Sequence, residues 1–202
     1  MTPTLFVHTT LEKILDASAS QHQHLCPRQV LGARMGLLGA ARLGIVLPRA
    51  DKRLRVLVET DGCAADGISA ATGCYVGRRT LRVIDYGKVA ATFVDVETRR
   101  AVRIAPRCDV RALAASYAPE AATRWEKQLL GYQRMLDAEL LRAQEVTLTF
   151  SLEHWLSKEG ARVHCAQCGE EILNEREIQI HDSVYCLACI GGAYYEPNVN
   201  KI

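Results

Sequence analysis

The apolar residues in the first quarter of the chain follow helical periods. Thr9 and Glu12 have the spacing of a capping box, which predicts a first helix that delivers the chain to His22. The apolar stripe of this helix comprises Leu11, Ile14, Leu15 and Ala19. A second helix is predicted from Pro27 to about Val46, because proline is preferred at the first helical position.

Small residues recur at every fourth position of the second predicted helix. This ridge comprises Gly32, Gly36, Ala40 and Gly44. Such residues weaken a helix, so a row of them indicates close approach by another backbone. Two interpretations are open at this stage: packing against another helix of the same chain, or the seam of a homodimer.

The middle of the chain alternates between apolar and polar residues, which predicts strands. In residues 53–60, Leu54, Val56 and Val58 lie on one face of a strand. Residues 61–74 are typical of a loop, a short helix and a stop. Further strands are predicted in two stretches of residues 80–96 that turn near Tyr86 and Gly87, and in residues 99–106. Helical patterns return in residues 109–117 and 119–143. Strands clustered between helices predict an α+β fold, with helices packed on an antiparallel sheet.

The composition indicates one sizeable core and an annex. Of the 202 residues, 49% are hydrophobic, so we expect an α+β core domain over residues 1–155 and a small second domain over residues 156–202. We find no export signal and no run of about 20 uncharged apolar residues of the kind that spans a membrane. A cytoplasmic protein without a membrane partner is therefore expected.

Charge is distributed unevenly along the chain. Residues 1–118 carry 17 Lys and Arg against 10 Asp and Glu, whereas residues 119–202 carry 8 against 13. A basic main body suits an anionic ligand or an acidic partner. An arginine-rich surface partly neutralised by the acidic C-terminal region is the alternative.

Four of the eight cysteines form a zinc motif near the C-terminus. Two CxxC pairs, separated by 17 residues, comprise Cys165, Cys168, Cys186 and Cys189. In a chain of this size this spacing favours metal thiolates over disulfides. Four thiolates complete a tetrahedron, so we predict a structural zinc in a treble-clef or zinc-ribbon annex, with His164 and His181 not needed as ligands. The segment between the pairs has more acids than bases, so nucleic-acid binding is not expected.

A second group of potential ligands precedes the second helix. His22 and His24 are two residues apart, which places them on one side of an extended segment, so we assign them to the connection between the helices. Cys26 falls at the predicted N-cap, where the helix dipole favours thiolate. The group predicts a soft transition-metal site. A buried cysteine beside two ordinary polar histidines is equally compatible with the pattern.

Several separated motifs resemble those of one family. The segments HQHLCPRQVLGARMG, ETDGCAADGISAATGCYVGRRTL and DYGKVAATF occur in order between His22 and Phe93. In this they resemble the FmdE family, named for a component whose gene lies with those of formylmethanofuran dehydrogenase. The chain departs from the usual family residues at Gln23, Arg28, Gly67, Tyr75 and Arg78, where Arg28 replaces a glycine.

The resemblance implies an α+β core that dimerises, a treble-clef finger and a cleft with a metal site. The ligands that it implies for a second transition metal, taken as zinc, are His22, His24, Cys26 and Cys63. It further implies that Asp66 orients a ligand or accepts a proton, and that Cys74 and Arg78 line the cleft. Asp66 and Arg78 are thus the candidate catalytic residues. The alternatives are a helix-start carboxylate for Asp66 and a small buried hydrophobe for Cys74.

Two functions from different classes follow. The first is a metal-binding protein accessory to, or associated with, molybdenum or tungsten formylmethanofuran dehydrogenase-type enzymes, with a cleft metal that acts on a small anionic substrate. The alternative is a zinc-finger module for protein interaction or regulation, without catalysis. The sequence does not decide whether the protein is an enzyme. A structural homodimer with a merely buried cluster is the third possibility.

Overall fold

The computed structural model describes residues 10–156 and 160–196, with the side chains of Gln21 and His22 excepted. The chain divides into two compact units, Met1–Thr147 and Leu148–Ile202. This boundary falls a few residues before the predicted division at residues 155 and 156. No helix in the described part of the chain has the length and apolar character needed to cross a bilayer.

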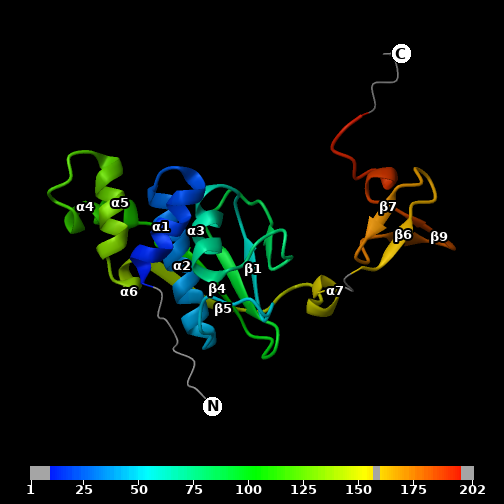
Figure 1. Ribbon diagram of the computed structural model, residues 1–202, viewed down its shortest axis with the longest axis horizontal. Helices are drawn as coiled ribbons and strands as arrows, with labels where there is room; N and C mark the ends of the chain where they lie inside the picture. Colours follow the sequence, from blue (N-terminus) through cyan, green and yellow to red (C-terminus); the bar gives the residue numbers. More distant parts are fainter. Residues whose placement is uncertain (1–9, 157–159, 197–202) are drawn as a thin grey trace. The chain divides into compact units, whose positions relative to one another are not determined.

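The larger unit is built on a five-stranded sheet (Figure 1). Its strands are β1 (Leu54–Val58), β2 (Leu81–Val83), β3 (Ala91–Asp95), β4 (Ala101–Pro106) and β5 (Leu141–Val146), in the spatial order β2-β1-β3-β4-β5. The expected α+β class is confirmed, with one difference at an edge. Strands β1, β3, β4 and β5 pair in antiparallel fashion, whereas β2 pairs with β1 in parallel. Strands β2 and β3 therefore flank β1 on opposite sides and do not form a hairpin.

Strand β5 was not expected, because its residues lie at the end of a predicted helix. The structure ends that helical pattern earlier, with α5 (Arg124–Arg134) and the single turn α6 (Asp137–Leu140). Residues such as Leu141 and Arg142 favour helix in isolation. Pairing with β4 along six residues, from Ala101 opposite Val146 to Pro106 opposite Leu141, supplies interstrand hydrogen bonds instead. Tertiary pairing has overridden local preference here.

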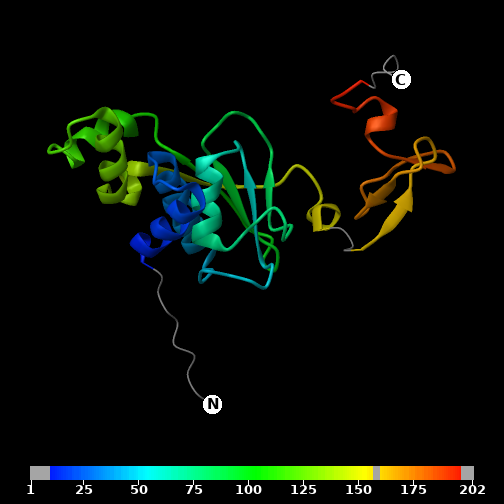
Figure 2. The ribbon, with the colours of Figure 1, turned by 45° about the horizontal axis from the view of Figure 1, so that its top comes forward.

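Three helices lie side by side on one face of the sheet, as both views show (Figures 1 and 2). They are α1 (Leu11–His22), α2 (Pro27–Leu43) and α3 (Cys63–Thr72). Helix α1 begins one residue later than expected, because Thr10, not Thr9, is its N-cap. Helix α2 ends earlier than Val46, because Gly44 adopts a left-handed conformation with φ of 69°. The predicted inner face of β1 is confirmed, since Leu54, Val56 and Val58 are buried.

Helices α2 and α3 pack so closely that the glycines at their crossing are required. A Cβ on Gly32 would lie 2.1 Å from the Ala64 carbonyl oxygen, and one on Gly67 would lie 2.1 Å from the Gln29 carbonyl oxygen. Farther along, a Cβ on Gly36 would lie 2.9 Å from the Ala71 Cβ. The predicted ridge therefore serves packing within the chain. Because the contacts advance in the same direction along both helices, the two helices are parallel and their N-termini lie at the same end.

Helix α4 (Val110–Tyr117) and helix α5 form a second pair. They also meet closely, because a Cβ on Gly131 would lie 2.5 Å from the Ala114 carbonyl oxygen. Arg34 of α2 holds this pair in place. Its guanidinium donates to the carbonyl oxygens of Tyr132 and Met135, each at 2.8 Å, and to Asp137 Oδ1 at 2.7 Å. The C-terminal end of α5 is thus fixed against α2.

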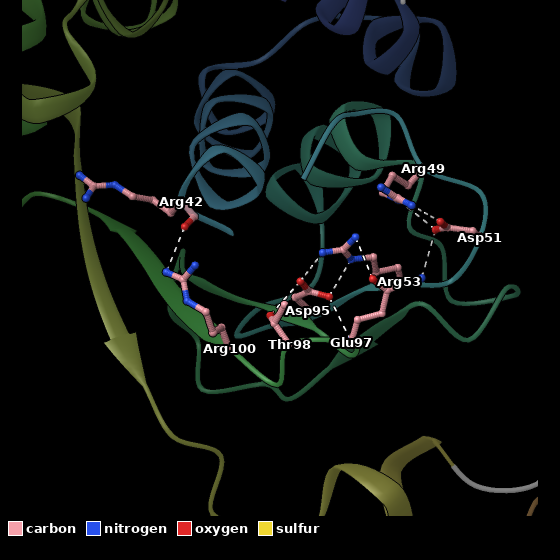
Figure 3. Close-up of polar contacts among 8 residues, drawn as sticks. All are labelled: Arg42, Arg49, Asp51, Arg53, Asp95, Glu97, Thr98 and Arg100. Carbon is pink, nitrogen blue, oxygen red and sulfur yellow. Dashed lines mark hydrogen bonds and ion pairs between the residues drawn. The ribbon is translucent and has the colours of Figure 1, made fainter. Parts of the chain in front are cut away.

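A buried carboxylate organises the turn after β3 (Figure 3). Asp95 is fully buried and accepts two hydrogen bonds from Arg53, at 2.9 and 2.7 Å. It also accepts hydrogen bonds from the Thr98 hydroxyl at 2.8 Å and the Glu97 backbone N–H at 3.1 Å. The Arg53 guanidinium, more than any other group, lowers the pKa of Asp95 to about 2. This network ties the β3–β4 turn to the start of β1.

The smaller unit contains short elements around the four predicted zinc ligands. They are α7 (Leu152–Leu156), the antiparallel pair β6 (Arg162–His164) and β7 (Glu171–Leu173), the antiparallel pair β8 (Ile178–Ile180) and β9 (Ser183–Tyr185), and a 3-10 turn, η1 (Ala188–Ile190). Among the described residues of this unit, Trp155, Cys165 and Ile172 are the buried ones. So small a core indicates that the unit depends on something other than apolar burial.

Candidate metal centres and an arginine-lined cavity

The four cysteines of the smaller unit converge. The sulfur atoms of Cys165, Cys168, Cys186 and Cys189 all lie within 4.8 Å of one another. The turn between β6 and β7 carries the first pair, and Gly169 supplies the positive φ, 75°, that the chain needs just after it. Four thiolates at this spacing fit a tetrahedral zinc with no open position. The cysteine cluster expected from the sequence is confirmed.

The electrostatics of these thiols favour a bound cation. Backbone N–H groups, first that of Cys168 and then that of Cys186, lower the pKa of Cys165 to about 6. In contrast, the hydrogen bond with Cys186 and then burial raise the pKa of Cys189 to about 12. Four crowded sulfurs therefore cannot all ionise on their own. A divalent metal supplies the charge that permits it.

In the larger unit, Cys26 and Cys63 meet at the paired N-termini of α2 and α3. Cys26 is the N-cap of α2, as predicted, and Cys63 is the first residue of α3. Burial, followed by the hydrogen bond with Cys26 and the charge of that thiol, raises the pKa of Cys63. Gln29 fixes this corner, because its amide oxygen accepts from the Cys26 N–H at 2.6 Å and its amide nitrogen donates to the Ser18 carbonyl at 3.1 Å.

The two histidines differ from expectation. His22 is the last residue of α1, so its assignment to the connection was wrong. The helix continues to that point because Gln23, with φ of 62°, ends it in the left-handed conformation. The His22 side chain lies outside the described residues. His24 is exposed, and among the described residues it does not form a three-ligand group with Cys26 and Cys63.

The remaining predicted site residues lie in two places. Asp66 is one turn beyond Cys63, and its charge is a minor contributor to the raised pKa of that thiol. Cys74 and Arg78 lie beyond the opposite end of α3. The Cys74 side chain is buried, with its sulfur 3.5 Å from the Leu54 carbonyl oxygen, and Arg78 donates to the Ala50 carbonyl at 2.6 Å. The structure therefore does not bring Cys74 and Arg78 to the cavity described next.

A cavity of about 790 Å³ adjoins the two core thiols. Cys26 and Cys63 contribute to its wall, as do residues at the start of α2, the end of β4, and the first halves of α4 and α5. Its lining contains four arginines and no acidic residue; the arginines are Arg28, Arg107, Arg111 and Arg124. Cys108, which has no motif partner in the sequence, is exposed and lies in the same wall.

Sequence reasoning missed these arginines as site residues. They have no motif spacing and belong to three separate regions of the chain, so the only signal was the basic balance of residues 1–118. Trp125 and Tyr132, both from α5, also line the cavity. The arrangement can hold an anionic molecule beside two thiols.

Comparisons with known proteins agree with this architecture. A family model described as FmdE, molybdenum formylmethanofuran dehydrogenase operon, matches residues 21–151. A relative from Archaeoglobus fulgidus, named "Probable S-adenosyl-L-methionine-binding protein", is 32% identical over 97 residues, which are 46% of this chain and 26% of the relative. The chain thus matches about a quarter of that relative's length.

A solved structure is similar over nearly the whole chain. It is the crystal structure of an FmdE-like protein, of the tungsten formylmethanofuran dehydrogenase type, from Syntrophus aciditrophicus. The comparison covers 97% of this chain and 100% of that one, with a TM-score of 0.61 and 22% sequence identity. At this identity the likeness shows a shared fold.

Proposed function

Because the chain belongs to the FmdE family, we propose that it holds one metal ion in the core, in addition to the zinc of the finger, and that the adjoining cavity binds a small anionic molecule. The observation that carries this proposal is the contact of the Cys26 and Cys63 thiols in the wall of a cavity that contains arginines and no acids. Thiols at helix N-termini ionise readily, because the dipole and the free N–H groups stabilise negative charge.

The proposed ligands are Cys26 and Cys63, completed by His24 and His22. Sulfur and imidazole ligands suit zinc and other transition metals. Such a metal, with one position open, supplies an activated water at neutral pH. Asp66, one helical turn from Cys63, is placed to orient a ligand or to accept a proton. Arg78 has no part in this proposal, because it lies outside the cavity.

The partners are proposals as well. The names of the matching family and of the similar structure both refer to formylmethanofuran dehydrogenase, which supports an association with a molybdenum or tungsten enzyme of that type. A homodimer is also proposed, but Gly36 does not test it, because that glycine already packs against α3. Light scattering of the wild type at micromolar concentration tests it directly: a monomer would contradict it.

The name of the Archaeoglobus relative raises S-adenosylmethionine as a ligand. That molecule carries a sulfonium and an ammonium group against one carboxylate, so it is cationic overall. An acid-free cavity wall with four arginines disfavours it. We therefore propose an anion for this chain.

A second function is favoured by the surface of the finger. Several large apolar side chains of the smaller unit are exposed, namely Leu173, Ile178, Ile180, Leu187, Ile190, Tyr194 and Tyr195. Exposed apolar groups of this kind support contact with another protein. The acidic balance of the segment between the cysteine pairs supports a protein partner over nucleic acid.

Metal analysis of protein purified without added metal tests the core site. We expect two equivalents per chain in the wild type and one in Cys26→Ser, because the two sites share no ligand. Serine is a preferred N-cap residue, so α2 should keep its start. The control is Cys108→Ser, which alters the same cavity wall at a cysteine outside the proposed ligands and should keep both equivalents. A wild type with one equivalent, unchanged in Cys26→Ser, shows that the core cluster is structural.

A further inference from the structure

The charge in the cavity wall is not neutralised from within the protein. Of the four arginines, Arg107 makes a long contact with Asp109, at 3.8 Å. Arg28, Arg111 and Arg124 form no ion pair with any residue that the structure describes. Three guanidinium groups thus share one concave surface without a counter-ion. Their mutual repulsion opposes folding unless a ligand or solvent ions relieve it.

A buried phenol points to the same space. Tyr132 is 1% exposed and lines the cavity. Within the described ranges its hydroxyl makes no hydrogen bond, although buried polar groups normally have a partner. Burial raises the pKa of this phenol, and the charges of Arg111 and Arg124 oppose that rise. The hydroxyl and the two guanidinium groups are therefore neighbours.

Helix direction adds to this field. The cavity wall contains residues from the first turn of each of four helices: Arg28 in α2, Cys63 in α3, Arg111 in α4 and Arg124 in α5. The N-terminal end of each helix carries partial positive charge. The first turns of α2 and α4 contain no acidic residue. In α5, the first-turn acid Glu126 accepts hydrogen bonds from the Thr123 N–H and hydroxyl, so it is engaged in capping.

We propose that this cavity binds an organic molecule with at least two oxyanionic groups, phosphate or carboxylate, held by Arg28, Arg111 and Arg124. Guanidinium groups match both kinds of oxyanion with paired hydrogen bonds. The volume of about 790 Å³ is that of a site for an organic ligand and far exceeds a single inorganic ion. The indole of Trp125, 49% exposed in the same wall, offers an apolar surface for the organic part.

This inference names the ligand class for the cavity of the proposed function, and it makes the arginines, not the metal, the main binding groups. Arg28 makes the site particular to this chain, since the family that the sequence resembles usually has glycine there. Phosphate esters and polycarboxylates share the required chemistry, so the test uses one of each.

The test is calorimetric titration of the full chain with ADP and, separately, with citrate, at low and at physiological salt. We expect at least one of the two to bind, and adenosine, which lacks the anionic groups, to bind at least about tenfold more weakly. Arg111→Gln with Arg124→Gln should weaken binding at least about tenfold, since two charge-assisted contacts are removed. Lys127→Gln is the matched control, because it removes a positive charge from α5 outside the cavity wall.

Three results would overturn the proposal: binding of neither polyanion, equal loss in Lys127→Gln, or adenosine binding as tightly as ADP. The Cys26→Ser variant separates this inference from the proposed core metal. If it loses the metal and keeps polyanion binding, both stand. If polyanion binding disappears with the metal, the arginines are not the main binding groups and the inference fails. A wild type that binds the polyanion but only one metal refutes the core metal alone.

Discussion

The finger and the core present cysteines in opposite ways. In the finger, four sulfurs within 4.8 Å come from one segment of 25 residues, Cys165 to Cys189. In the core, Cys26 and Cys63 come from separate helices and meet because α2 and α3 run parallel across a glycine contact. The finger is closed around its metal, whereas the core thiols face a cavity. Local spacing is enough to recognise the first kind of site but not the second.

The largest expected effect is loss of the finger fold when its metal is removed. Because this unit buries few residues, metal binding supplies its folding energy. Cys165→Ser, Cys189→Ser or strong chelation should expose residues 160–196 to protease, with the cleavages assigned by mass spectrometry. The larger unit should keep its protection. Cys108→Ser, which changes a cysteine outside the finger, serves as the control. Unchanged protection of residues 160–196 after chelation would show that zinc is not what holds the unit.

The next effect tests the helix contact that assembles the core thiols. Gly32→Leu places a side chain where the Ala64 carbonyl oxygen lies, 2.1 Å from the new Cβ. We expect it to reduce the free energy of unfolding by about 3 kcal/mol, since overpacking forces the helices apart. Chemical denaturation monitored by circular dichroism measures this change.

The same variant sharpens the comparison between the two sites. Separating α2 from α3 should remove the proposed core metal and leave the finger's zinc in place. Gly77→Leu is the matched control, because nothing lies within 4 Å of a Cβ at Gly77. Wild-type stability in Gly32→Leu would contradict the close helix contact.

A smaller effect is expected from Asp95→Asn, which affects the larger unit alone. Arg53 lowers the pKa of Asp95 from an ordinary value of 3.8 to about 2. Because the folded-state pKa is lowered, this carboxylate contributes stability above about pH 4 and loses the contribution as pH falls towards about 2. We expect the variant to unfold more easily by about 2 kcal/mol at neutral pH.

Denaturation across a pH range from about 2 to about 7 checks this sign. The difference between wild type and Asp95→Asn should be constant from about pH 5 to about pH 7 and should shrink below about pH 4. A difference that grew on acidification would contradict the assignment. Asp109→Asn is a suitable control, because Asp109 is exposed and its contact with Arg107 is long, at 3.8 Å.

Much of the fold was readable from local patterns, and the failures share one cause. The start of α2 at Pro27, the position of Cys26 as its N-cap and the buried face of β1 all depend on neighbouring residues. The missed strand β5, the parallel pairing of β2 and the end of α1 at His22 do not. In the first two, hydrogen bonds from a distant strand decide the state of the residues. In the third, a left-handed Gln23 extends the helix beyond what the spacing of the two histidines suggested.

The sequence by itself determined the zinc motif, the family resemblance and the basic character of the first 118 residues. Each is a property of residue type and spacing along the chain, which folding does not alter. The cavity was decided by the tertiary structure, because residues such as Arg28, Arg111 and Arg124 lie far apart in sequence and carry no common pattern. They meet only because the helix that bears each one begins at the same end of the fold, and that convergence is set by the glycine contacts between helices and by Arg34 clamping α5 against α2.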